Sequence, residues 1–241
     1  MDVRGRGVLI TGASRGLGAA LAKELGARGA RLALVARGEQ TLAEIVTAIR
    51  DAGGQAHAIA ADVGSKEDVY AIAGAAASLV GDVQLAVHNA STLGAVPLRL
   101  LADTACEDLE RVLAVNVIGP FRLTKALAGP MLLRGGGLVV HVRSDAATGA
   151  YPRWGAYGAS KAALDLLART WASELEGTGV RFFGVDPGEM DTEMHAAAIP
   201  DADRASLARP ADVAQRIAEM IRDDTIVSGA LLDATAWRVE R

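Results

Sequence analysis

Residues 8–18 read VLITGASRGLG, an apolar run followed at once by a turn that contains three glycines. The run has the composition of a buried strand, and residues 16–28 have the length and composition of a helix. Glycine permits the tight turn and lets a phosphate approach the backbone, while the helix N-terminus offers free N–H groups and a favourable dipole. The stretch therefore predicts a dinucleotide pyrophosphate site. Its Gly-x-x-x-Gly-x-Gly spacing differs from the commonest fingerprint, so a plain glycine turn is the alternative.

The same alternation of apolar runs and helical segments continues along the chain. Strands are predicted at residues 8–10, 31–36, 56–60, 83–88, 138–142, 180–185 and 226–232, and helices at 16–28, 40–52, 66–80, 105–133, 155–175 and 211–222. Alternation implies right-handed βαβ units, and continuous apolar strands are typical of a parallel sheet covered on both faces. No linker, repeat or low-complexity stretch interrupts the pattern. We expect one α/β domain over residues 1–241, a Rossmann-like, doubly wound, mostly parallel sheet of about seven strands with helices on both faces.

The composition argues against nucleic-acid-binding, membrane-spanning, secreted and disulfide-rich proteins. The chain has 241 residues, 51% of them hydrophobic, and a net charge of -4. It has no basic run, which argues against nucleic-acid binding. No apolar stretch reaches the roughly eighteen residues of a membrane span, and the first residues lack the apolar region of a secretory signal. The single cysteine, Cys106, leaves no internal disulfide framework. We expect a cytoplasmic protein that binds neither nucleic acid nor membrane.

The end of the second predicted strand bears on the choice of dinucleotide. A site for NAD usually carries an acidic residue there, which binds the ribose hydroxyls. This chain has Val35-Ala36-Arg37, without a carboxylate. The Arg37 guanidinium suits a 2′-phosphate, and Arg15 in the glycine turn is a second cation expected nearby. Two cations and no acid predict NADP(H), with two solvated surface arginines as the alternative.

Tyr157 and Lys161 stand four residues apart at the start of a predicted helix, so the phenol and the ammonium share one helix face. A free tyrosine titrates near pH 10, and a neighbouring cation lowers its pKa. Lowering that pKa to about 7 takes roughly 4 kcal/mol, which a desolvated lysine and a positively charged nicotinamide could supply. Tyr157 would then be a competent acid and base for a carbonyl–alcohol pair. The pair alone is a weak motif, and a partly exposed helix with a packed tyrosine is the alternative.

Seven ordered motifs resemble those of the short-chain dehydrogenase/reductase family over nearly the whole chain. They are Thr11 to Gly18 for the glycine turn, Asp62-Val63 for the acidic pair at the adenine, Asn89-Ala90 from an Asn-Asn-Ala-Gly motif, Asn116, Ser144, the pair Tyr157 and Lys161, and Asp186-Pro187-Gly188 with Thr192. The resemblance implies that Ser144 polarises the substrate carbonyl and that Tyr157 protonates it. It also implies that Lys161 holds the nicotinamide ribose and lowers the tyrosine pKa, and that Asn116 positions a water that resupplies the proton.

The resemblance also implies the residues around the cofactor and the substrate. Cofactor contacts are expected from Gly12, Ser14, Arg15, Gly16, Leu17, Gly18, Arg37, Asp62, Val63, Asn89, Ala90, Tyr157, Lys161, Pro187, Gly188, Met190 and Thr192. Residues 189–209 are expected to form a substrate lid. By position alone, Asp145, Trp154, Glu189 and Met194 are candidates for the substrate pocket. No histidine pair has the spacing or companion carboxylate of a metal site, so no metal is expected.

Several residues depart from the family pattern. His88 and Ser91 replace the first Asn and the Gly of Asn-Asn-Ala-Gly, and Arg143 replaces a serine that often precedes Ser144. Adjacent strand residues point to opposite faces, so Arg143 should not displace Ser144, although it could add charge near the cofactor. The last strand is followed by 233–235 rather than by a glycine-rich turn, which bears on oligomer geometry. Of the other histidines, His57 and His141 are expected to be satisfied core residues and His195 a solvated loop residue.

The expected activity is reversible carbonyl reduction or secondary-alcohol oxidation with NADP(H), as a ketone or aldehyde reductase or an alcohol dehydrogenase. An epimerase or dehydratase on the same fold is an alternative, although the residues after Gly188 leave little room for the larger substrate region such enzymes carry. A non-catalytic NADP-binding sensor is a second alternative, but such proteins commonly lose the tyrosine or the lysine. The family is usually oligomeric through its long helices, so a homodimer or homotetramer is expected.

Overall fold

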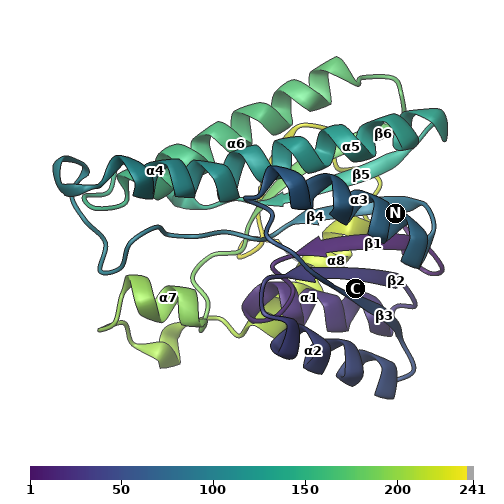
Figure 1. The fold of residues 1–241 in the computed structure, drawn as a ribbon, viewed down its shortest axis with the longest axis horizontal. Coiled ribbons are helices and arrows are strands. Elements are labelled where there is room, and N and C mark those ends of the chain that lie inside the picture. Colours follow the sequence, from purple (N-terminus) through teal and green to yellow (C-terminus); the bar gives the residue numbers. More distant parts are fainter. Residues whose placement is uncertain (238–241) are drawn as a thin grey trace.

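Seven parallel strands form one sheet in the computed structural model, which describes residues 1–237 (Figure 1). In spatial order β3-β2-β1-β4-β5-β6-β7, the strands are β3 (Gln55–Ala60), β2 (Arg31–Ala36), β1 (Gly7–Thr11), β4 (Val83–His88), β5 (Gly137–Val142), β6 (Val180–Asp186) and β7 (Ala230–Asp233). The central strands β1, β4 and β5 are continuous apolar runs that are buried almost throughout, as expected for strands covered on both faces. The predicted Rossmann-like, doubly wound sheet is confirmed.

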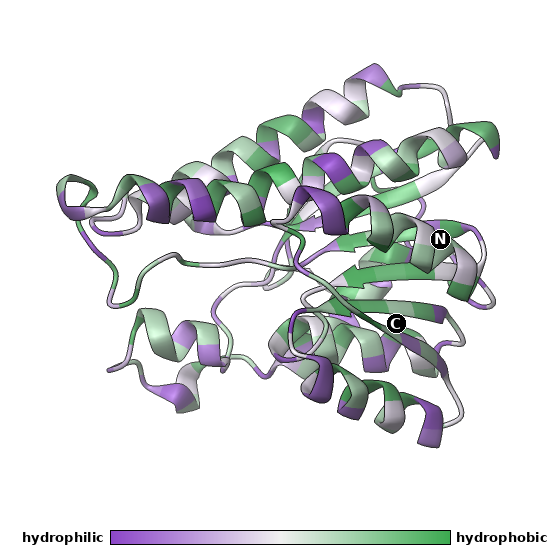
Figure 2. Cartoon of the chain, in the orientation of Figure 1, coloured by the Kyte–Doolittle hydropathy of each residue, from purple (hydrophilic) through white to green (hydrophobic). Residues whose placement is uncertain are grey.

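Helices cover both faces of this sheet. The helices α1 (Gly16–Ala27), α2 (Glu39–Asp51) and α8 (Pro210–Arg222) enclose one core cluster on one face. The helices α3 (Lys66–Val80), α5 (Gly119–Leu133) and α6 (Gly155–Glu174) cover the other. Figure 2 shows the strands as the most continuously apolar part of the chain, between helices whose outer faces are polar. Each helix thus buries one apolar stripe against the sheet.

The predicted long helix over 105–133 is interrupted in the middle. It consists of α4 (Cys106–Leu113), a π-helical turn (Ala114–Ile118) and α5, and the turn contains Asn116. Such π-turns occur mostly as single bulges and frequently at functional sites. Contrary to the sequence expectation, the stretch Cys106–Leu133 is long and apolar enough to cross a membrane. Half of its most apolar window is buried in the protein, and core helices of globular proteins pass the same test.

The last strand begins later than predicted. Residues 226–229 form a turn, and β7 covers Ala230–Asp233, in register with the end of β6. The apolar residues Ile226 and Val227 suggested an earlier start, but Gly229 has a φ of +89°, which a strand does not accommodate. The Ile226 side chain packs in the core from this turn instead.

The order of the strands fixes the place of a ligand. The sheet grows outward in opposite directions from β1 and β4, so the loops after these two strands diverge and leave a crevice at their carboxyl ends. The Thr11 hydroxyl, at the end of β1, donates to the carbonyl oxygen of Val87 and accepts from the backbone N–H groups of Asn89 and Ala90. These bonds hold the two loops together at the base of the crevice.

Candidate active site

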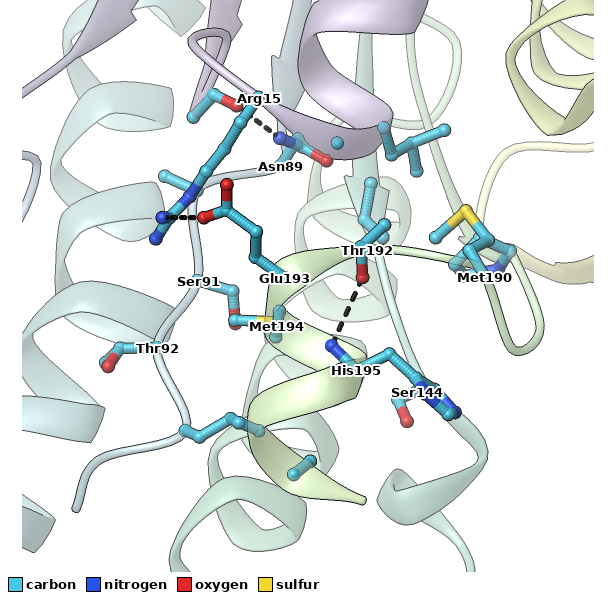
Figure 3. A pocket seen from close by; sticks show the side chains of 18 of the residues that line it. Arg15, Asn89, Ser91, Thr92, Ser144, Met190, Thr192, Glu193, Met194 and His195 are labelled. Atoms are coloured by element: carbon cyan, nitrogen blue, oxygen red, sulfur yellow. Dashed lines mark hydrogen bonds and ion pairs between the residues drawn. The ribbon is translucent and has the colours of Figure 1, made fainter. Parts of the chain in front are cut away.

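The glycine turn after β1 is shaped by close backbone contacts. Gly12 has a φ of +67°, and a Cβ there would lie 2.8 Å from the Cα of Ala90. A Cβ on Gly18 would overlap the carbonyl oxygen of Gly12. The Asn89 side chain donates to the carbonyl oxygens of Thr11 and Gly12, each at 3.0 Å. The replacement of the neighbouring family residue by His88 therefore leaves the support of this turn by Asn89 intact (Figure 3).

A single large cleft runs from this turn across the carboxyl ends of the strands. Its volume is about 1620 Å³, well above the roughly 300–1,000 Å³ of a typical small-molecule site. All but two of the predicted catalytic and cofactor-binding residues line it. The exceptions are Gly18, which packs on the turn from behind, and Asn116, which is buried under the 89–92 segment. A cradle that only glycine permits and a cleft of this size fit a dinucleotide.

The charged residues at the far end of the cleft are arranged around the glycine turn. Arg37 follows β2, is exposed and lines the cleft, without an acidic residue at the strand end. Arg15 forms an ion pair with Glu193 of the short helix α7 (Glu193–Ala198). Asp62 is held by Arg111 and by the backbone N–H of Gly64, and these contacts lower its pKa although partial burial acts in the opposite direction. The carboxylate is therefore ionised and pre-oriented.

Tyr157 and Lys161 lie one turn apart on α6, and both are buried. The Lys161 Nζ is 5.4 Å from the centroid of the Tyr157 ring and donates to the carbonyl oxygen of Val142 at 2.8 Å. Burial raises the pKa of Tyr157 to about 12, although hydrogen bonds with Ser144 and Ser91 favour the phenolate. Burial lowers the pKa of Lys161 to about 8. The expected lowering of the tyrosine pKa is thus not a property of the chain alone, because loss of hydration outweighs the neighbouring hydroxyls.

Ser144 follows β5 and lines the cleft beside the tyrosine. Its hydroxyl donates to Asp145 at 3.0 Å and accepts from the backbone N–H of Ala146 at 3.2 Å. The second Asp145 oxygen accepts from the Tyr151 hydroxyl at 3.0 Å. The serine hydroxyl is therefore tied to a carboxylate that itself borders the substrate end of the cleft.

The Asn116 side chain makes four hydrogen bonds within the protein. Its oxygen accepts from the backbone N–H of Thr92 at 2.8 Å and from the Ser91 hydroxyl. Its amide nitrogen donates to the Thr92 carbonyl and to the Ser160 hydroxyl, each at 2.9 Å. Both amide hydrogens are thus used within the protein, and the side chain fastens the 91–92 segment to the π-turn and to α6.

The segment that begins at residue 189 covers the cleft from the side of α7. Thr192 caps α7 by accepting from the backbone N–H of His195 at 3.2 Å, and its methyl group faces Gly16 (Figure 3). His195 is not a solvated loop residue as expected. It lies in α7 with a side chain that is 13% exposed, its Nε2 is 3.7 Å from Glu189, and it lines the cleft. A helix of six residues without a buried apolar face is hard to recognise in the sequence.

The remaining pocket candidates occupy the same region. Asp145, Trp154, Glu189 and Met194 all line the cleft, and the Trp154 ring meets the Tyr157 ring edge-on at 5.7 Å between centroids. Ser91 also lines it, beside Tyr157. The substrate end of the cleft therefore combines aromatic faces with several carboxylates.

Asp165 was not among the predicted site residues, but it is buried on α6 and paired with both His141 and Arg143. A signal was available, because Asp165 stands four residues after Lys161 and so shares its helix face. Arg143 follows β5 and donates to Asp165 rather than to Ser144, although both Arg143 and Ser144 line the cleft. His141 is only half satisfied, since its Nδ1 is buried with no hydrogen-bond partner among the described residues. His88 bonds the Thr124 hydroxyl at 2.8 Å.

Comparison with known proteins identifies the family. The short chain dehydrogenase family model matches residues 6–203. The chain belongs to the short-chain dehydrogenase/reductase family. It is 36% identical to a short chain dehydrogenase from Pseudocercospora fijiensis over 81% of this chain and 63% of that protein, so it spans less than two thirds of that relative. It is 34% identical to 3beta-hydroxysteroid dehydrogenase 1 from Eggerthella lenta, over 96% of this chain and 92% of that one.

Solved structures of the family agree in architecture. A putative short chain dehydrogenase from Pseudomonas syringae superposes with a TM-score of 0.89 at 34% identity, over 97% of this chain and 96% of that one. A metagenomic short-chain oxidoreductase in complex with NADP superposes with a TM-score of 0.82 at 29% identity, over 96% of this chain and 98% of that one. An NAD⁺-bound xylitol dehydrogenase superposes with a TM-score of 0.86 at 25% identity, over 97% of this chain and 98% of that one. Family members thus bind nicotinamide dinucleotides of both kinds, and this chain is an oxidoreductase of that family.

Proposed function

We propose that the protein interconverts a carbonyl and a secondary alcohol with NADP(H) as cofactor. The observation that carries this proposal is the convergence of Ser144, Tyr157 and Lys161 on one cleft that begins at the glycine turn. A sensor without catalysis has no need of a buried phenol and ammonium, both of which are costly to desolvate. An epimerase or dehydratase on this fold remains the second enzymatic reading.

The choice of NADP(H) follows from charge. Arg37 and Arg15 offer two guanidinium groups at the turn, and β2 ends without the carboxylate that would bind the ribose hydroxyls of NAD. These arginines would hold a 2′-phosphate, and Asn89 with Gly12 and Gly16 would shape the turn around the pyrophosphate. The NADP-bound metagenomic relative is a precedent within the family.

Residues of the chain stabilise the developing charge and transfer the proton. The cofactor supplies or accepts the hydride when it is bound. Ser144 turns its hydroxyl from Asp145 toward the substrate oxygen and stabilises the charge that develops there. Tyr157 gives its proton to the same oxygen in reduction and takes it back in oxidation. Lys161, held on the Val142 carbonyl, stabilises the phenolate that Tyr157 becomes.

We also propose that the protein works in the cytoplasm as a homodimer or homotetramer, with no nucleic-acid or membrane partner. The outer face formed by the π-turn, α5 and α6 exposes Ile118, Phe121 and Leu166, a pattern that suits contact with a second copy. Sedimentation of a pure monomer at micromolar concentration would overturn the oligomer.

Thermal unfolding with NADPH and NADH titrated separately tests the cofactor. A ligand that binds the folded state raises its stability according to its affinity, so NADPH should raise the Tm more than NADH. Loss of NADPH absorbance with a panel of ketones and aldehydes then tests the reaction. A larger shift with NADH would reject the cofactor assignment. Binding of NADPH without turnover of any carbonyl or alcohol would favour the sensor.

A further inference from the structure

A cluster of buried charges lies behind Lys161, between α6 and the ends of β5 and β6. The buried charge cluster consists of Lys161 and Asp165 on α6, His141 and Arg143 at the end of β5, and Asp186 at the end of β6. The exposed fractions of the paired side chains range from 2% for His141 to 14% for Asp186. Charges at such depth are stable only when they are paired and hydrogen-bonded.

Arg143 joins the two carboxylates of this cluster. Its Nε donates to one Asp165 oxygen at 2.9 Å, and a terminal nitrogen lies 3.6 Å from Asp186. The other Asp165 oxygen meets His141 Nε2 at 2.9 Å. Asp186 also accepts from the backbone N–H of Gly188 at 3.0 Å, so it shapes the start of the segment after β6. The guanidinium therefore connects α6 to the loop that borders the cleft.

The sheet is built to admit this arrangement. His88, His141 and Gly184 are register partners on the adjacent strands β4, β5 and β6. A Cβ on Gly184 would lie 2.6 Å from His141 Nε2, so only glycine leaves room for the imidazole. The imidazole in turn reaches Asp165, which lies one helical turn after Lys161. The position of Asp165 beside Lys161 thus depends on contacts from two strands.

The charges of the cluster balance only with Arg143 in place. Burial lowers the pKa of His141, and burial lowers the pKa of His88 to about 3, so both imidazoles are neutral. Two carboxylates then face two cations, Arg143 and Lys161. Without Arg143 the buried site would carry one uncompensated negative charge next to Lys161.

We propose that Arg143 is a positioning residue, which compensates Asp165 and Asp186 so that Lys161 remains on the Val142 carbonyl in the charge state that the reaction requires. This inference deepens the proposed function and rests on the role of Lys161 in it. Arg143 itself donates to neither Tyr157 nor Ser144 in the structure, so its effect on the reaction passes through the carboxylates.

The sign of the effect follows from the groups that face Lys161. They are Tyr157 and Asp165 from α6, His141 and Arg143 from β5, Asp186 from β6 and, one strand further, His88 from β4. Burial lowers the pKa of Lys161, whereas Asp165 and Asp186 raise it. Removing Arg143 leaves those carboxylates uncompensated, so the pKa of Lys161 rises. Asp186 also raises the pKa of Tyr157, so the phenol becomes harder to ionise.

Titration of the lysine ammonium groups by NMR in ¹⁵N-lysine protein measures this directly. The chain has four lysines, and Lys161→Met assigns the resonance of interest. We expect Arg143→Met to raise the Lys161 midpoint by about one pH unit and Asp165→Asn to lower it by a similar amount. The double variant removes one charge of each sign and should return the midpoint close to its wild-type value. Arg143→Lys keeps the positive charge, so it should leave the Lys161 midpoint close to its wild-type value. Arg222→Met removes an arginine at an exposed helix end and is the matched control.

The pattern across the variants decides the proposal. An unchanged Lys161 midpoint in a folded Arg143→Met protein would overturn it, and so would equal shifts in the single and double variants. If Arg143→Met does not fold, recovery of folding in the double variant supports the charge balance, and the direction of the Asp165→Asn shift still tests it. The titration needs no substrate, so its result does not depend on the activity assay. A wild-type protein that reduces no carbonyl would reject the proposed function, and the Lys161 midpoints would still test the role of Arg143.

In the active enzyme the same variants predict a change in pH dependence. The alkaline rise of kcat for alcohol oxidation should move to higher pH in Arg143→Met, while KM for the alcohol changes little. A loss of kcat at all pH values without a shift of the profile would indicate a merely structural role.

Discussion

Arg15 of the glycine turn is paired with Glu193 of α7, so the two sides of the cleft are joined above the proposed phosphate site. Both side chains are largely exposed, and such pairs contribute at most about 1 kcal/mol. To reach a 2′-phosphate, the Arg15 guanidinium must break its ion pair with Glu193 or contact the carboxylate and the phosphate at the same time. Glu193→Gln should therefore tighten NADPH binding up to about fivefold and leave NADH binding unchanged. Calorimetric titration measures both affinities, and weaker NADPH binding in this variant would contradict the competition.

Arg37 should decide between the two dinucleotides. Arg37→Asp places at the end of β2 the carboxylate that binds ribose hydroxyls and repels a phosphate. We expect the ratio of kcat/KM for NADPH to that for NADH to fall by at least about tenfold, the equivalent of one lost charged contact. Arg50→Asp, at the far end of α2, is the control for a change of net charge. An unchanged ratio would refute the role assigned to Arg37.

Tyr157→Phe should remove turnover and spare cofactor binding. The variant keeps the ring that packs edge-on against Trp154 and loses only the hydroxyl. Loss of a general acid costs roughly 10²–10⁴ in rate, and it reduces kcat rather than uniform binding. Stopped-flow turnover and NADPH titration separate the two quantities. Substantial kcat in the phenylalanine variant would move the proton transfer to another group.

Lys161 should make stability depend on pH in the alkaline range. Its pKa falls from 10.5 to about 8 on folding because of burial, so between these values the unfolded chain binds more protons than the folded one. Stability therefore rises with pH in this window, and below it the buried ammonium is a cost of roughly 3 kcal/mol. Urea unfolding at pH 7.5 and pH 9.5 should show this rise in the wild type and less of it in Lys161→Met. An equal rise in both would assign it to other groups.

Much of the fold followed from local patterns. Continuous apolar runs predicted six of the strands within a residue or two, because a strand covered on both faces has no polar positions to obscure it. The last strand was misplaced because Ile226 packs in the core from a turn that precedes Gly229, while Val227 is exposed. The interruption of the long helix around Asn116 was not predicted, although Gly119 and Pro120 follow it directly and Pro120 has no N–H to donate to the preceding turn.

The site was predictable where a motif fixes a backbone shape and less so where side chains pair across elements. Gly12 and Tyr157 lie where their motifs indicate. The pairing of Asp165 with Arg143 and the partial burial of the His195 side chain depend on which strand and helix meet in space. The position of Asp165 on the helix face of Lys161 does not by itself reveal that partner. The pKa of Tyr157 depends on the balance of burial and hydrogen bonding, which only the full environment determines.

The close packing of Gly184 against the His141 ring has an evolutionary corollary. A chain with a side chain at 184 has no space for an imidazole at 141, and a chain that loses the imidazole leaves a void that a larger residue at 184 can fill. Among related sequences, histidine at position 141 should therefore be gained and lost together with glycine at position 184.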